Sequence, residues 1–200
     1  PVNCRFTPAG LVSGPRMLKI VRVPSSARTG PTWRIAGWCI GAIMKPIPAS
    51  ARQRSTMSGP IRSHRGIIDK YIGDAIMAYW GPPFTEHGEQ ASLACLAAIE
   101  MADRGAALRT ELPELLGVRA VPSDCDVRIG IATGEVLVGS IGSEFMMSYT
   151  VMGDAVNLAS RLEGANKIYG SHSLASAPAI AAAGDVIEVR EIDRLVVVGQ

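Results

Sequence analysis

Two segments of this 200-residue chain constrain its fold more than any other feature. The first, Gly66–Gly81, reads GIIDKYIGDAIMAYWG, and its apolar side chains alternate on both sides of a glycine. This pattern predicts a β-hairpin with its turn at Tyr71–Gly73. The second, Val127–Gly170, predicts a strand that turns at Thr133–Gly134, a returning strand, a further strand and then a helix.

Apolar side chains at helical spacing predict two long helices. The first runs from Glu86 to about Leu112, and the second runs from Asp154 to about Lys167. A short helix is expected at Ser176–Ala183, and closing strands are expected at Val186–Val198. Strands that alternate with helices in this way indicate an α/β or α+β sandwich, in which helices pack on a sheet.

Charge is distributed very unevenly along the chain. Residues 1–68 contain no Asp or Glu against eleven Lys or Arg, whereas residues 69–200 contain all eighteen acidic side chains and nine basic ones. Residues 1–62 also have scattered Pro and Gly without a sustained hydrophobic period. We therefore expect residues 1–65 to be a basic, irregular segment, separate from a domain at residues 66–200.

Four interpretations of this basic segment are open. An Arg- and Ser-rich, acid-poor sequence is typical of an organelle transit peptide. A basic arm is also typical of proteins that bind nucleic acid or an anionic membrane. The apolar stretch Ile35–Met44 is too short to span a bilayer, and it lies far from the N-terminus for a signal peptide. We favour the fourth interpretation, a reading-frame error that replaced the natural sequence, because the recognisable sequence begins so sharply.

Four polar side chains have spacings that indicate chemistry. Lys70 lies four residues before Asp74 across a glycine, and Asn157 lies four residues before Arg161 on one helix face. Taken singly, each has an ordinary explanation as a turn aspartate, a solvated lysine or a polar residue on an amphipathic helix. Within the phrases KYIGD and GDAVNLASRLE, however, they resemble the catalytic domain of class III nucleotidyl cyclases, the adenylate and guanylate cyclase family.

The resemblance implies a fold, an activity and roles for individual residues. The implied fold is α+β with a ferredoxin-like βαββαβ core, and the activity converts ATP or GTP into a 3′,5′-cyclic nucleotide and pyrophosphate. Lys70 and Thr150 match the positions that select the base, Asn157 matches the one that positions the ribose, and Arg161 matches the one that neutralises phosphate charge. Lysine at the first position favours ATP, because guanine-specific members usually have a carboxylate there.

The metal site that the resemblance implies is incomplete. Asp74 matches the second of the family's two metal-binding aspartates, and the implied cofactor is Mg²⁺ or Mn²⁺, because hard oxygen ligands suit these ions. The first aspartate normally lies on the first strand, in a phrase resembling FxDIxGFT. Residues 1–68 contain no such phrase and no carboxylate. We therefore expect a cyclase fragment whose core is incomplete at its N-terminal strand.

These expectations together predict an adenylate cyclase domain that makes cyclic AMP from ATP in intracellular signal transduction. In the family two domains pair head to tail, which implies a cytoplasmic homodimer with shared active sites. A nucleic-acid partner is not expected, because the basic segment has few aromatic side chains on which bases could stack. A membrane would be reached only through modules absent from this chain. The alternative is a catalytically inactive cyclase-like module that only dimerises or binds nucleotide.

Overall fold

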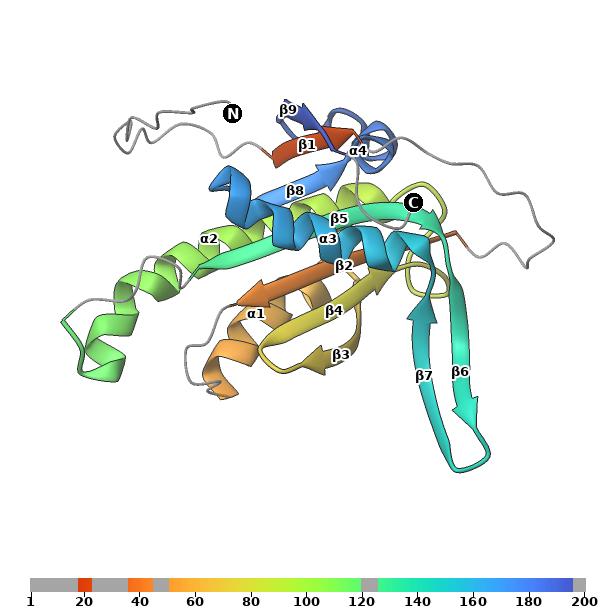
Figure 1. Ribbon diagram of the computed structural model, residues 1–200, viewed down its shortest axis with the longest axis horizontal. Helices are drawn as coiled ribbons and strands as arrows, with labels where there is room; N and C mark the ends of the chain where they lie inside the picture. Colours follow the sequence, from red (N-terminus) through yellow and green to blue (C-terminus); the bar gives the residue numbers. More distant parts are fainter. Residues whose placement is uncertain (1–17, 23–35, 45–50, 120–125, 196–200) are drawn as a thin grey trace, which may run out of the picture.

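The computed structural model describes residues 18–22, 36–44, 51–119 and 126–195. Seven strands form one sheet in the order β3-β4-β2-β5-β8-β1-β9, and β6 and β7 form a separate two-stranded ribbon. In chain order the elements (Figure 1) are β1 (Leu18–Arg22), β2 (Ala36–Met44), α1 (Ala51–Ser63), β3 (Ile67–Ile72), β4 (Ala75–Trp80), α2 (Gln90–Leu116), β5 (Val127–Glu135), β6 (Leu137–Ser143), β7 (Met146–Met152), α3 (Asp154–Tyr169), β8 (Ser173–Ser176), α4 (Ala177–Ala183), a 3₁₀ turn (Gly184–Val186) and β9 (Val189–Arg194).

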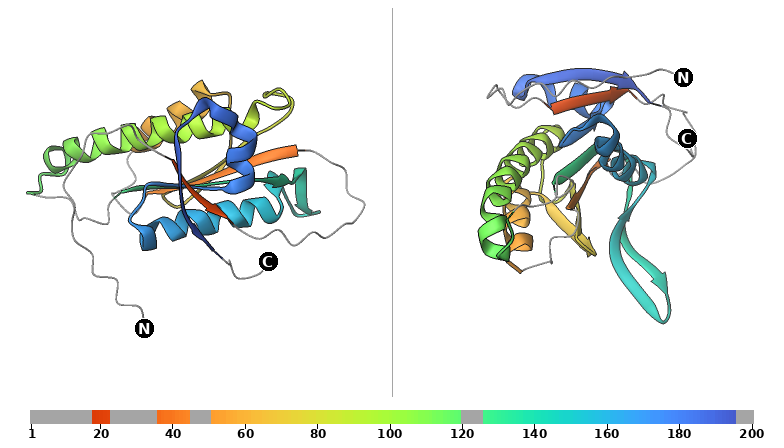
Figure 2. Two further views of the ribbon diagram at one scale, coloured as in Figure 1. Left: turned by 90° about the horizontal axis from the view of Figure 1, so that it is seen from above. Right: turned by 60° about the vertical axis from the view of Figure 1, so that its left-hand side comes forward.

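The six elements from β2 to β5 form a ferredoxin-like βαββαβ unit. β2 lies between β4 and β5 and is antiparallel to both, and β3 pairs with the outer side of β4. Helices α1 and α2 pack together on one face of the sheet, and α3 covers the opposite face over β2, β5 and β8 (Figure 2). The predicted α+β fold with a ferredoxin-like core is therefore confirmed.

Three elements lie within the segment that we expected to be irregular. The prediction is wrong for β1, β2 and α1, whereas residues 1–17, 23–35 and 45–50 lie outside the described residues. The β2 sequence AGWCIGAIM is a continuous apolar run, which suits a strand with a neighbour on each side. On α1, Met57 and Ile61 are four residues apart and both are buried in the core. The division of the chain at residue 65 stays a prediction.

The strand β2 has the first position in the ferredoxin-like core. What the core lacks here is therefore the acidic phrase of the family rather than a strand, since none of the residues of β2 is Asp or Glu. At this position the core has the expected strand with its backbone pairing, but it lacks the metal-binding aspartate that the family has there.

The hairpin predicted at Gly66–Gly81 is confirmed as β3 and β4. Its turn is Gly73–Asp74 rather than Tyr71–Gly73, because Ile72 already pairs with Ala75. Gly73 has a φ of 63°, a left-handed conformation that glycine adopts at little steric cost. The turn therefore places the carboxylate of Asp74 at the start of β4.

The other predicted elements are present, and several boundaries differ. α2 begins at Gln90 rather than near Glu86, and α3 matches the second predicted helix. The predicted turn at Thr133–Gly134 is wrong, because both residues continue the pairing of β5 with β2 and the strand ends at Glu135. The short helix is α4, and the closing strand is β9. No helix within the described ranges is long and apolar enough to cross a membrane.

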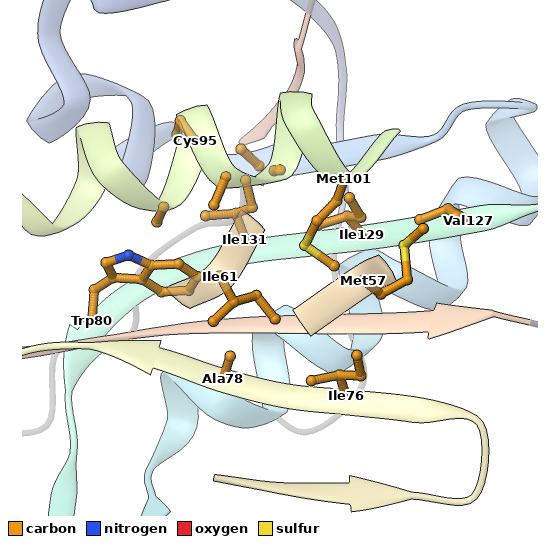
Figure 3. Close-up of a cluster of buried hydrophobic side chains, with 14 of the residues drawn as sticks. Met57, Ile61, Ile76, Ala78, Trp80, Cys95, Met101, Val127, Ile129 and Ile131 are labelled. Atoms are coloured by element: carbon orange, nitrogen blue, oxygen red, sulfur yellow. The ribbon is translucent and has the colours of Figure 1, made fainter. Parts of the chain in front are cut away.

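The core between the sheet and the helices α1 and α2 is apolar and closely packed. Trp80, Ile61, Met101 and Ile131 are fully buried in it (Figure 3). The indole N–H of Trp80 donates to the carbonyl oxygen of His64 at 2.8 Å, so that the polar atom of this buried ring has a partner. This core fixes the hairpin β3–β4 against α1, and the hairpin contains two of the predicted site residues.

On the opposite face, α3 approaches β5 so closely that one position has no room for a side chain. A Cβ atom on Gly130 would overlap the carbonyl oxygen of Ala159 and the amide nitrogen of Glu163, which are backbone atoms of α3. Asn166 secures the same approach, because its Nδ2 donates to the carbonyl oxygen of Ile129 at 2.8 Å. Backbone contact therefore sets the position of α3 on the sheet.

We expect Gly130→Ala to lower the free energy of unfolding by about 3 kcal/mol, because its methyl group requires α3 to move. The matched control is Gly164→Ala on an exposed position of α3, where nothing lies within 4 Å of an added Cβ. The control should instead stabilise by about 0.5–1 kcal/mol, because alanine loses less entropy in a helix. Urea unfolding followed by tryptophan fluorescence measures both, and a Gly130→Ala variant as stable as the parent would contradict the described contact.

Candidate functional site

A β-bulge in β3 decides which side chains face the candidate site. Ile68 pairs with Ala78, but the next pair joins Lys70 to Met77, so Asp69 is the extra residue. Ile68 packs with the core beneath α1 and α2, whereas Met77 packs with the cluster beneath α3. The bulge therefore brings Lys70 to the face of the sheet that α3 covers, since a shift of one residue reverses the face of the residues that follow.

Asp69, Lys70 and Thr150 meet at one oxygen atom. Thr150 lies on β7 and donates its hydroxyl hydrogen to Oδ2 of Asp69 at 3.0 Å. Nζ of Lys70 lies 3.4 Å from the same oxygen. The side chain of Asp69 is 1% exposed and that of Lys70 is 40% exposed. The structure thus brings together the two predicted base-selecting residues, which are distant in sequence, around a buried carboxylate.

Asp69 is not among the site residues predicted from the sequence. The sequence gives one indication of its role: Asp69 is a charged residue that follows two isoleucines and directly precedes Lys70. A strict alternation of β3 would place Asp69 and Lys70 on opposite faces, so that the bulge is needed to bring them together. Tyr79 is also close to the group, and its burial raises the pKa of its hydroxyl, with Tyr149 and the Asp69 carboxylate raising it further.

The helix α3 presents the second pair of predicted residues. Asn157 and Arg161 are both exposed, and the buried stripe of α3 lies on its other side at Ala155, Leu158, Ala159 and Leu162. Within the part of the chain that the structure describes, neither the side chain of Asn157 nor that of Arg161 has a hydrogen bond or ion pair with another residue. An amide and a guanidinium four residues apart on an open helix face are free to bind a polyanionic ligand.

The carboxylate of Asp74 lies at the turn of the hairpin and is partly buried. Its negative charge acts on Glu163 of α3: burial raises the pKa of Glu163, the ion pair with Arg128 opposes that shift, and the Asp74 charge adds to it. The pair itself is buried, with 2.8 Å between Nε of Arg128 and Oε1 of Glu163. Asp74 and the second half of α3 are therefore in electrostatic contact.

The acidic residues of this region do not fit a site for two metal ions. Within the described ranges there is no group of three or more His, Cys, Asp or Glu side chains that could hold a metal. The strand β2 ends beside Asp74, because Ile43 pairs with Ala75, and β2 supplies no carboxylate. Two-ion sites need carboxylates from two positions, so we derive no catalytic step through a metal at Asp74.

The ribbon of β6 and β7 extends away from the rest of the domain (Figure 1). Its tip is apolar and open to solvent, with Phe145 96% exposed and Met146 77% exposed. Met147 and Tyr149 on the same strand are also exposed, whereas Thr150 is buried. Exposed apolar side chains gathered in this way are typical of interaction sites.

Comparison with known proteins gives the family. Residues 61–173 match the family described as the adenylate and guanylate cyclase catalytic domain. The chain belongs to this family, whose members are metal-dependent in general.

The curated relatives include proteins named as adenylate cyclases. The chain is 38% identical over 136 residues to adenylate cyclase 1 of Rhizobium meliloti (strain 1021), which covers 66% of this chain and 19% of that protein. It is also 38% identical over 109 residues to adenylate cyclase of Anabaena cylindrica, which covers 54% of this chain and 20% of that protein. The chain thus spans about a fifth of the length of these relatives.

Solved cyclase structures have the same fold. The adenylyl cyclase CyaB from P. aeruginosa aligns with a TM-score of 0.64 and 27% identity over 77% of this chain and 83% of that chain. The guanylyl cyclase Cya2 aligns with a TM-score of 0.61 and 26% identity over 76% of this chain and 80% of that chain. Because proteins of both specificities match almost equally, this similarity establishes the cyclase family without deciding the nucleotide.

We expect Arg128→Met to lower the free energy of unfolding by about 3 kcal/mol, because it leaves Glu163 buried without its partner. Loss of Arg128 also removes the interaction that opposes the raised pKa of Glu163. A carboxyl whose pKa is higher in the folded state binds a proton on folding, so the deficit of the variant should shrink as the pH falls from 7 to 5. Urea unfolding at several pH values measures this difference.

The control for this experiment is the double variant Arg128→Met with Glu163→Leu. It removes both charges, and it should recover most of the lost stability at pH 7. A double variant as unstable as Arg128→Met alone would show that packing by Arg128, rather than the ion pair, stabilises this region.

Proposed function

We propose that the domain is an adenylate cyclase, which converts ATP to cyclic AMP and pyrophosphate in intracellular signal transduction. The observation that supports this choice is the meeting of Lys70 and Thr150 at Oδ2 of Asp69. An ammonium group and a hydroxyl held side by side suit the N1 and the 6-amino group of adenine, which are likewise adjacent. The adenylate cyclases among the relatives support the same nucleotide.

The proposed reaction is an in-line displacement at the α-phosphorus. The 3′-hydroxyl of the ribose loses its proton to solvent water, and its oxygen forms a bond to the α-phosphorus. The bond from that phosphorus to the oxygen bridging to the β-phosphate breaks, and pyrophosphate leaves with that electron pair. Asn157 would position the ribose, and the guanidinium fork of Arg161 would bind the phosphate oxygens as negative charge develops on them. Their exposure on α3 leaves both side chains available to a triphosphate.

A homodimer with shared sites would complete this arrangement. Asn157 and Arg161 lie on an open helix face, so a single chain leaves one side of the proposed site uncovered. The exposed apolar tip of the β6–β7 ribbon gives a second copy of the chain a surface to cover. In such a pair Asp74 of one chain would serve a different site from Lys70, Asn157 and Arg161 of that chain.

A catalytically inactive module is the second candidate, and the acid-free β2 favours it. Asp74 is the carboxylate that would bind Mg²⁺ or Mn²⁺, ions that in such reactions activate a nucleophile and neutralise phosphate charge. A single carboxylate binds either ion weakly. The cytoplasm, with its ATP, is the compartment that we propose for either function.

We expect the parent chain to make little or no cyclic AMP from ATP with Mg²⁺. Met44→Asp should raise turnover at least about tenfold, because it adds a second carboxylate at the end of β2, one residue after Ile43, which pairs with the neighbour of Asp74, Ala75. The matched control is Met44→Asn, which has the same shape without the charge. Cyclic AMP and cyclic GMP are quantified by chromatography with ATP and GTP supplied separately.

The outcomes of this assay separate the two candidates. Cyclic AMP from Met44→Asp that disappears on adding Arg161→Ala would support the cyclase mechanism. A folded Met44→Asp variant that binds ATP and is no more active than Met44→Asn would favour the inactive module. Preferential formation of cyclic GMP would contradict the proposed substrate.

We expect the double variant Phe145→Asp with Met146→Asp to shift the protein from dimer to monomer, because two charges would be buried at the proposed interface. The matched control is Phe84→Asp, since Phe84 is also exposed, at 64%, but lies on the loop before α2. Sedimentation velocity at several protein concentrations measures the dimer fraction. Equal dissociation in the ribbon variant and in the control would place the interface elsewhere.

A further inference from the structure

The buried carboxylate of Asp69 is not explained by the cyclase mechanism described above. It touches the two proposed base-reading residues, and its side chain is shielded from solvent. We propose that Asp69 is a specificity-determining positioning residue, which turns the Thr150 hydroxyl into a pure hydrogen-bond acceptor toward the base. This inference rests on the proposed use of Lys70 and Thr150 to bind adenine.

The argument begins with the hydroxyl group of Thr150. A free threonine hydroxyl donates one hydrogen bond and accepts two, so it binds a carbonyl and an amino group about equally well. A carboxylate only accepts, and Oδ2 of Asp69 lies 3.0 Å from Oγ1 of Thr150. The hydroxyl hydrogen is therefore directed to Asp69, and only the lone pairs of Oγ1 remain for a ligand.

This orientation discriminates between the two purine nucleotides. Adenine has an amino group at position 6, which donates to an acceptor, whereas guanine has a carbonyl there, which needs a donor. With its hydrogen held by Asp69, Thr150 suits the amino group and leaves a guanine carbonyl facing another acceptor. A site that leaves polar groups unpaired rejects a ligand much more strongly than one that merely fits it less well.

Lys70 is oriented by the same carboxylate. Its ammonium group has three N–H donors, and Nζ lies 3.4 Å from Oδ2 of Asp69. Its side chain is partly exposed, so the remaining donors can reach a ligand. N1 of adenine is an acceptor and suits such a donor, whereas N1 of guanine bears a hydrogen. Lys70 can only donate, with or without Asp69, so the carboxylate decides the sense of the contact at Thr150 alone.

The bulge of β3 is what makes this arrangement possible. Asp69 has no partner residue on β4, so its side chain is not confined to the alternation of the ladder. Bulges often re-aim a side chain at an active site. Here the extra residue supplies the carboxylate and also brings Lys70 to the same face of the sheet.

The test is binding of fluorescent ATP and GTP analogues to the whole chain in the presence of Mn²⁺, measured as the ratio of the two dissociation constants. We expect the parent to prefer ATP. Asp69→Asn has the same shape but an amide that can donate to Oγ1, which frees the hydroxyl hydrogen for guanine. The preference for ATP should therefore fall by about tenfold, the scale of one buried hydrogen bond.

Two variants of Thr150 complete the experiment. Thr150→Ser keeps the hydroxyl and should keep the preference for ATP. Thr150→Val has no hydroxyl and should lose most of that preference. In the Thr150→Val background, Asp69→Asn should have no further effect on the ratio. A purely structural role of Asp69 would instead weaken ATP and GTP binding equally and leave the ratio unchanged. Circular dichroism and thermal melting confirm that each variant is folded.

Failure of this inference can be told apart from failure of the proposed function. A parent that prefers GTP, or binds neither analogue, overturns the proposed use of ATP and the inference with it. A parent that prefers ATP while Asp69→Asn keeps the same ratio overturns the role of Asp69 alone. The role of Asp69 is also overturned if Asp69→Asn changes the ratio of dissociation constants to the same extent whether residue 150 is threonine or valine.

Discussion

Backbone contact between α3 and β5 determines where half of the candidate site lies. At Gly130 the strand has no side chain, and the backbone of α3 at Ala159 occupies that space. Asn166 and the buried pair of Arg128 with Glu163 join the same two elements by polar contacts. With the buried stripe of α3 fixed on the sheet, its opposite face must present Asn157 and Arg161 to solvent. The exposure of these two residues is thus a consequence of packing on the other side of the helix.

The other half of the site depends on a local departure from regular pairing. The single extra residue of β3 changes the face of Lys70 and adds a buried carboxylate beside it. Burial of an ionised carboxylate is costly, and contacts with the hydroxyl of Thr150 and the ammonium of Lys70 offset part of that cost. A leucine or valine at position 69 would satisfy the apolar pattern of the strand with less desolvation. The presence of aspartate at this bulge is therefore better explained by ligand recognition than by stability.

Much of this fold follows from hydrophobic periodicity, and the exceptions have physical causes. The hairpin β3–β4 and the helix α3 follow from periods of 2 and 3.6 residues. The phrases KYIGD and GDAVNLASRLE identify the family and four of the five predicted site residues, and the fifth, Thr150, lies three residues before the second phrase. The strand β2 does not follow from alternation, because a strand with neighbours on both sides can be apolar throughout. The expected turn at Thr133–Gly134 is absent because pairing with β2 satisfies those backbone groups instead. Asp69 was missed because a bulge depends on the partner strand, and a single strand sequence does not show where its partner omits a residue.

The ribbon of β6 and β7 links base recognition to the proposed dimer. Thr150 lies near its fixed end, opposite Gly139 and in contact with Asp69, whereas Phe145 lies at its free end. A two-stranded ribbon without further neighbours is only marginally stable in water. In the proposed dimer its free end would gain order, because a second copy would cover the apolar tip, whereas its fixed end holds the hydroxyl of Thr150 beside Asp69. Strand β7 connects the apolar tip to Thr150. A monomer and a dimer would then differ in two ways: in which groups complete the site, and in how firmly Thr150 is held.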